Sequence, residues 1–134
     1  MNIAIVLADF YSDISQQLLD SCEKALRGVG NVQTCIERVP GALEIPFALK
    51  TLANKNSPTA LVALGCVIRG ETYHFETVAD ICAQGILQVQ METGVPVGNG
   101  VLTVENMTQA QARTGKGADA ALAAVRLAML AGRP

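Results

Sequence analysis

An uninterrupted run of apolar or small residues, ALVALGCV at 60–67, is the feature that most limits what this chain can fold into. A half-buried strand alternates apolar and polar residues, so a run without alternation indicates a strand covered on both faces. A second run of this kind, IAIVLA, occupies residues 3–8. Such strands are typical of parallel sheets that carry helices on both sides.

Strand-like and helical segments alternate along the chain. Strands are expected at 3–8, 32–36, 60–67 and 95–103, the last one interrupted at Gly98, Asn99 and Gly100. Helices are expected from Ser12 to the glycines at 28 and 30, and then at 43–53, 74–92, 108–113 and 118–131. On the 74–92 helix, one face is expected to hold Val78, Ile81, Cys82, Gly85, Ile86 and Val89. This order predicts an α/β fold: one domain over 1–134, a three-layer α/β/α sandwich with a four-stranded parallel sheet, flavodoxin-like.

The composition excludes several classes of protein. Half of the 134 residues are hydrophobic and 16% are charged, which argues against disorder. With a net charge of −2 and no cluster of Lys or Arg, the chain is not expected to bind nucleic acid. No apolar run approaches the roughly 20 residues that a membrane span needs. The sparsely charged surface suggests contact with further copies of the chain.

The cysteines point to a reducing compartment. Cys22, Cys35, Cys66 and Cys82 lie in apolar stretches and form no C-x-x-C pair, so we expect four buried thiols without a disulfide or a zinc site. Met1 leads directly into a strand-like run with no basic segment before it, so no signal peptide is expected. Both observations predict a cytoplasmic protein.

Residues suited to chemistry follow the predicted strands. In open parallel sheets, ligands bind beyond the carboxyl ends of the strands. His74, the only histidine, comes shortly after the 60–67 strand and suits proton transfer near neutral pH, although a lone histidine is more often structural. Phe10 can be a stacking platform for a planar ring or peripheral core, and Tyr11 beside it suits a pocket rim.

Three further groups each have a structural alternative. Gly70-Glu71-Thr72 before a helix can seat a phosphate or be an ordinary strand-to-helix turn. Arg113 and Lys116 can hold a phosphate or polyol, or simply complement helix ends. Glu44 can bind ligand hydroxyls or only offset a helix dipole.

Three segments together resemble the lumazine synthase family. VPGALEIP at 39–46 is similar to the family's V-P-G-A-[FL]-E-[IL]-P, and GCVIRGETYHFE at 65–76 to its diagnostic G-x-V-I-R-G-x-T-x-H-[FY]-[DE]. GVPV at 94–97, followed by GVLTVEN at 100–106, resembles the third segment. The resemblance runs nearly end to end and in order.

The resemblance implies an enzyme that condenses 5-amino-6-(D-ribitylamino)uracil with 3,4-dihydroxy-2-butanone 4-phosphate. The steps are Schiff base formation, phosphate elimination and ring closure, without a metal or organic cofactor. It implies His74 as the catalytic proton shuttle, Phe10 as the stacking plate and Arg113 as the charge that pairs with phosphate. The implied substrate contacts are Phe10, Tyr11, Gly41, Ala42, Leu43, Glu44, Cys66, Val67, Ile68, Glu71, Thr72, Asn99, Arg113 and Lys116.

The resemblance also implies homopentamers, with Asn99 and Arg113 reaching the site of an adjacent chain. We expect a pentamer or a pair of pentamers rather than a sixty-subunit shell. The chain departs from the family pattern in three places: Asn99 stands where an aromatic residue is common, Tyr11 where Asn is frequent, and the 114–116 stretch is short.

Two other functions remain open from the sequence. One is the archaeal-type riboflavin synthase, a paralogue that joins two lumazine molecules; the RGETYH segment argues against it. The other is a non-catalytic flavin- or lumazine-binding protein, against which the retained His74 and Arg113 argue.

Overall fold

A four-stranded, all-parallel sheet forms the middle layer of the protein. The computed structural model describes all residues from 1 to 134. The strands β1 (Asn2–Ala8), β2 (Gln33–Val39), β3 (Ala60–Ile68) and β4 (Val97–Val104) lie in the order β2-β1-β3-β4. Every neighbouring pair is parallel, so the predicted α/β sandwich with a four-stranded parallel sheet is confirmed.

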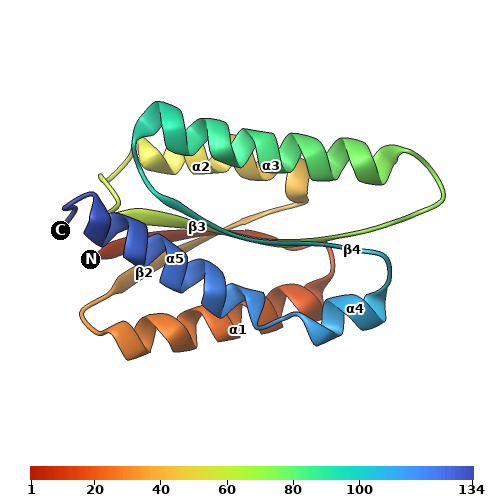
Figure 1. Ribbon diagram of the computed structural model, residues 1–134, viewed down its shortest axis with the longest axis horizontal. Helices are drawn as coiled ribbons and strands as arrows, with labels where there is room; N and C mark the ends of the chain where they lie inside the picture. The colour runs from red at the N-terminus through yellow and green to blue at the C-terminus, as the bar shows by residue number, and fades with distance from the viewer.

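Helices cover both faces of the sheet. The helices α1 (Ser12–Val29), α4 (Met107–Ala112) and α5 (Lys116–Leu130) lie on one face. The 3₁₀ turn η1 (Ala42–Glu44) and the helices α2 (Ile45–Ala53) and α3 (His74–Thr93) lie on the other (Figure 1). None of these helices combines the length and the apolar character required to cross a membrane.

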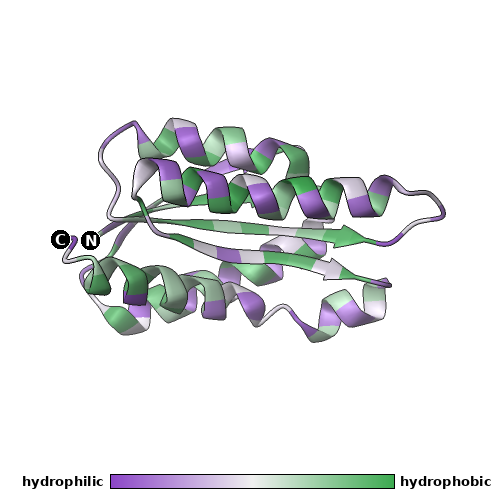
Figure 2. Ribbon diagram, turned by 45° about the horizontal axis from the view of Figure 1, so that its top comes forward, coloured by the Kyte–Doolittle hydropathy of each residue, from purple (hydrophilic) through white to green (hydrophobic).

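The two central strands are buried on both sides, as their apolar runs predict. Side chains alternate between the faces: Ile3, Ile5 and Leu7 of β1 pack toward α1 and α5, whereas Ala4 and Val6 pack toward α2 and α3. Figure 2 shows β3 as a mostly hydrophobic ribbon between helices that carry both hydrophobic and hydrophilic residues. Two apolar layers therefore hold the sheet, and polar groups are displaced to its ends.

The predicted interruption of the fourth strand is wrong. β4 continues through Gly98, Asn99 and Gly100, because these residues pair with Val62, Ala63 and Leu64 of β3, and α5 packs directly on the backbone here. A Cβ on Gly98 would lie 1.9 Å from the carbonyl oxygen of Ala120, and one on Gly100 would lie 2.6 Å from Leu64 Cδ2. The two glycines are required by close packing rather than by a turn.

One burial prediction is also wrong. Cys35 is exposed, because β2 is an edge strand that the helices leave largely uncovered, and its residues from Gln33 to Arg38 are all exposed. Ile81 lies at the border of the buried stripe of α3, which consists of Val78, Cys82, Ile86 and Val89, and is 50% exposed. The other three cysteines are buried, as expected.

The contact between β4 and α5 gives a matched pair of stability predictions. Gly98→Ala is expected to destabilise the protein by about 3 kcal/mol, because the new methyl group meets backbone that cannot move independently. Gly28→Ala, in α1 with nothing near its added Cβ, should instead stabilise by up to about 1 kcal/mol. Urea unfolding followed by circular dichroism measures both, and equal midpoints for the two variants would contradict this account.

Candidate active site

A cleft of about 390 Å³ opens at the carboxyl ends of β1, β2 and β3. β1 has β2 as its neighbour on one side and β3 on the other. The cleft lies at this reversal of strand order, which is the switch point of the sheet. The residues that line it are Phe10, Tyr11, Pro40, Gly41, Ala42, Leu43, Glu44, Cys66, Val67, Ile68, Gly70, Thr72, His74, Phe75 and Val78. We refer to it as the strand-end cleft.

Most of the residues singled out in the sequence meet in this cleft. Of those outside it, Glu71 lies on the same loop between two lining residues, while Asn99, Arg113 and Lys116 lie on other parts of the surface. The sequence interpretation missed three lining residues as contacts, Pro40, Phe75 and Val78, and considered Gly70 only as part of a possible phosphate seat. A signal for Val78 was available, because it lies one helical turn after His74 and therefore on the same side of α3.

Phe10 provides an aromatic wall at one side of the cleft. It directly follows the turn at the end of β1, and its side chain is 69% exposed. Tyr11 packs edge-on against it, with ring centroids 4.9 Å apart and planes at 73°. The edge contact leaves a ring face of Phe10 free for a planar ligand, since aromatic rings also stack face to face with an offset.

The turn after β2 brings a carboxylate to the cleft. Glu44 ends the 3₁₀ turn η1, whose first hydrogen bond runs from the Glu44 N–H to the Gly41 carbonyl at 3.2 Å. A Cβ on Gly41 would lie 3.3 Å from Glu44 Oε1, so glycine leaves room for this carboxylate. Oxygen atoms placed this way suit the hydroxyl groups of a polyol.

The segment between β3 and α3 presents unpaired backbone donors. The N–H groups of Gly70, Glu71, Thr72 and Tyr73 donate to no acceptor within the chain. The Thr72 hydroxyl oxygen accepts from the His74 N–H at 3.3 Å, which forms a turn at the start of the helix. Backbone donors at the beginning of a long helix favour an anion.

Arg69 does not serve as a cation for the cleft. Its guanidinium donates from Nε to Glu105 Oε2 at 2.7 Å and from Nη1 to Glu76 Oε1, and it lies over the Phe75 ring at 4.5 Å. The hydrogen bond with Glu76 raises the pKa of Arg69 and lowers the pKa of the Glu76 carboxyl. Two carboxylates therefore share one guanidinium, which leaves no positive charge in excess for the cleft.

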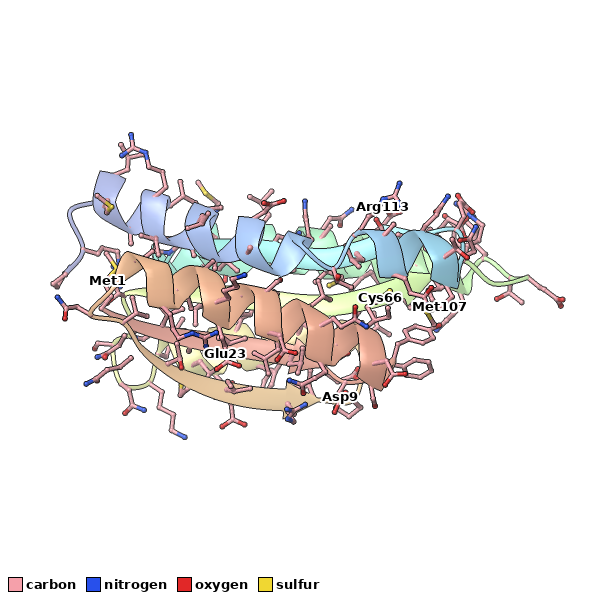
Figure 3. The ribbon with its side chains drawn as sticks, turned by 90° about the horizontal axis from the view of Figure 1, so that it is seen from below. Met1, Asp9, Glu23, Cys66, Met107 and Arg113 are labelled. Carbon is pink, nitrogen blue, oxygen red and sulfur yellow. The ribbon has the colours of Figure 1, made fainter.

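A second cleft holds the remaining candidate cations. It has a volume of about 420 Å³ and lies between β4 and the start of α5, where Arg113, Lys116 and Asp119 meet. Arg113 and Lys116, which were predicted to act together, therefore share a surface. Arg113 also donates to the Gln109 carbonyl at 3.0 Å. Figure 3 shows Arg113 pointing outward on the side of the molecule opposite to Asp9, the residue before Phe10.

Asn99 faces solvent from β4, between Gly98 and Gly100. Its side-chain oxygen accepts from the Val101 N–H at 2.9 Å. The residue lines neither of the two clefts. No group of three or more His, Cys, Asp or Glu side chains is arranged to hold a metal ion.

Comparison with known proteins identifies relatives along nearly the whole chain. The family described as 6,7-dimethyl-8-ribityllumazine synthase matches residues 1–131. The 6,7-dimethyl-8-ribityllumazine synthase of Paracidovorax citrulli is 47% identical over 133 residues, which cover 97% of this chain and 86% of that protein. The protein of the same name from Bordetella petrii is 50% identical, over 97% of this chain and 76% of that protein.

The cleft contains one thiol whose reactivity the structure predicts. Burial raises the pKa of Cys66 and Cys82 to about 11 and that of Cys22 to about 12, so at pH 8 about 0.1% or less of each is thiolate. Iodoacetamide at pH 8 should therefore modify the exposed Cys35 first. The rate at Cys66 should rise about tenfold per pH unit up to its pKa. Peptide mass spectrometry follows each site, and modification of Cys66 as fast as Cys35 would contradict this assignment.

Proposed function

Because the chain belongs to the 6,7-dimethyl-8-ribityllumazine synthase family, we propose that the strand-end cleft is where it performs that family's reaction. The protein is a transferase of riboflavin biosynthesis. The observation that carries the assignment of the cleft is the meeting of an aromatic wall, a row of free backbone N–H groups and the only histidine in one cavity. Residues 1–134 act as one domain in this proposal.

The pyrimidine, 5-amino-6-(D-ribitylamino)uracil, occupies the side of the cleft formed by β1 and β2. Its ring stacks on the exposed face of Phe10, with Tyr11 at the rim. Its ribityl hydroxyls meet Gly41, Ala42 and Glu44, with Leu43 beside them. Backbone groups of Val67 and Ile68, next to Cys66, bind the uracil edge.

The second substrate, 3,4-dihydroxy-2-butanone 4-phosphate, places its phosphate at the start of α3. The N–H groups of Glu71 and Thr72, with the Thr72 hydroxyl, hold the anion. The cleft itself is lined by no Lys or Arg, so backbone dipoles alone would face a doubly charged group. We therefore propose that Arg113 of an adjacent chain supplies the positive charge, with Lys116 of that chain nearby.

His74 moves the protons of the reaction. The exocyclic amine attacks the ketone and loses water to form a Schiff base, phosphate leaves, and the ring closes with loss of a second water. A neutral imidazole accepts a proton from the attacking amine and returns it to a leaving group, a role typically worth about 10²- to 10⁴-fold in rate. Holding the two substrates in register supplies much of the remaining acceleration.

We propose that the protein works as a homopentamer or a pair of pentamers. Large apolar side chains are exposed on α2, α3 and α5; examples are Phe47 at 80%, Met91 at 73% and Leu130 at 72%. Exposed apolar residues in such numbers support contacts between copies. The separate position of the Arg113 cleft supports a ring in which each chain completes its neighbour's site.

Location and partners follow from the same proposal. The partners are the small-molecule substrates and copies of the chain itself, without nucleic acid or membrane. Four unpaired cysteines support a reducing compartment, the cytoplasm.

Lumazine formation tests the assignment directly. The purified protein, mixed with both substrates, is expected to produce the absorbance and fluorescence of the lumazine. Lumazine alone should give no turnover, which separates this activity from that of the riboflavin synthase paralogue. Failure with both substrates would sink the proposal.

His74→Ala tests the role of the imidazole. The variant is expected to lose about 10²- to 10⁴-fold in kcat, because proton transfer then depends on water. It should still bind a non-reactive pyrimidine analogue with the affinity of the unmodified protein, measured by calorimetry. An unchanged kcat would remove His74 from the mechanism, and a protein that only binds would have no rate to lose.

Mixed assemblies test whether the site is shared. His74→Ala and Arg113→Ala chains are each expected to be nearly inactive alone, because each damages every site. Coexpressed, they should regain activity, since some sites then combine an intact His74 with an intact Arg113 from the next chain. The control is an assembly in which every chain carries both changes, so that no site combines an intact His74 with an intact Arg113. Absence of recovery in an intact mixed assembly would place both residues in one chain's site.

A further inference from the structure

The segment from 69 to 76 carries the anion cradle and His74. One side chain, that of Arg69, links the two ends of this segment. Between Arg69 and Glu76 the hydrogen bonds are local: Thr72 Oγ1 accepts from the His74 N–H, and the Tyr73 carbonyl accepts from Thr77. Gly70, Glu71, Thr72 and Tyr73 are all exposed. Apart from backbone connectivity, Arg69 supplies the contact that joins the beginning of this segment to its end.

Arg69 makes that contact with three partners on two elements. Its Nη1 pairs with Glu76 in the first turn of α3, and its guanidinium carbon lies 4.5 Å from the centre of the Phe75 ring. Its Nε pairs at 2.7 Å with Glu105, which directly follows β4. The start of α3 is thereby tied to the ends of both β3 and β4.

The arginine is unsuited to bind the substrate phosphate itself. Two carboxylates surround one guanidinium, so the cluster carries a net negative charge and repels an anion. One face of the guanidinium lies over Phe75, and Arg69 does not line the strand-end cleft. Of the side chains that Arg69 contacts, Phe75 does line the cleft, and it directly follows His74.

We propose that Arg69 is a positioning residue of the reaction: through Phe75 and Glu76 it fixes the cradle and His74 relative to the substrates without touching either. This inference rests on the function proposed above. A planar fork that also stacks on a ring cannot be reproduced by an ammonium group, so lysine should not replace it. A small displacement of the imidazole is enough to lower the rate about 100-fold.

The primary test is Arg69→Met, with Lys50→Met as its matched control. Lys50 forms an exposed ion pair with Glu92 at 3.6 Å between α2 and α3, and neither residue lines the cleft. Arg69→Met should lower kcat about 10- to 100-fold. It should also raise KM for the phosphorylated ketone, while KM for the pyrimidine stays within about twofold because Phe10 and the η1 turn are untouched. Lys50→Met should leave all three constants unchanged.

The fold of the variant should survive. The Arg69 N–H donates to the Val104 carbonyl at 2.9 Å, and this backbone bond is independent of the side chain. Thermal unfolding of Arg69→Met and Lys50→Met should therefore give similar midpoints. If Arg69→Met fails to fold, Arg69→Lys provides the same test. Its kcat should be closer to the value expected for Arg69→Met than to that of the unmodified protein.

Glu105→Gln distinguishes positioning from direct phosphate binding, because the two roles predict different changes in the kinetic constants. If Arg69 positions the segment, loss of a carboxylate loosens it and kcat falls. If Arg69 binds phosphate, the same change frees the guanidinium and lowers KM for the phosphorylated ketone, which would overturn the inference. An Arg69→Met enzyme as active as Lys50→Met would overturn it too. Failure of the unmodified protein to form lumazine would instead refute the proposed function.

Discussion

The buried pairing of β1 with β3 is the constraint on which the rest of the molecule depends. Both strands are covered on both faces, so they admit almost no polar side chain, and the chain must cross between parallel strands through helices. Their carboxyl ends therefore open at one edge of the sheet, where the groups that can do chemistry are gathered. The strand-end cleft exists because β1 and β3 are neighbours whose following turns diverge to opposite sides.

The positively charged side chains near this edge of the sheet do not point into the strand-end cleft. The arginine closest in sequence to the cradle is neutralised by Glu76 and Glu105, and Arg113, which forms no ion pair, faces a different cleft. The cradle thus has directional N–H groups but no positive side chain from its own chain. In the proposed assembly, the cradle would orient the phosphate by geometry, and the charge that strengthens binding would come from an adjacent chain. A strongly anionic substrate would then be held without a permanent cationic pocket in the single chain.

The sequence predicted what depends on local pattern and failed where packing partners decide. The apolar runs of β1 and β3 and the glycines after α1 identified most elements to within a few residues. The local sequence could not predict that β4 continues through Gly98 and Gly100. Both glycines are required by their close contacts with Ala120 and Leu64, which are distant in sequence. The exposure of Cys35 depends on β2 being an edge strand that the helices leave largely uncovered, which is a property of the tertiary packing. Motif resemblance gathered most of the cleft, but Phe75 and its contact with Arg69 needed coordinates.

Exposure links catalysis to assembly in this proposal. Phe10 and His74 are open to solvent in the single chain, yet stacking and proton transfer both gain from excluding water. A neighbour that brings Arg113 to the cradle would also cover the cleft, so one contact would supply both the charge and the dry environment. Electrostatic attraction between Arg113 and phosphate grows as water leaves. A monomer would then lack both the positive charge at the cradle and the exclusion of water from the cleft. Supplying only one of the two would not restore the site.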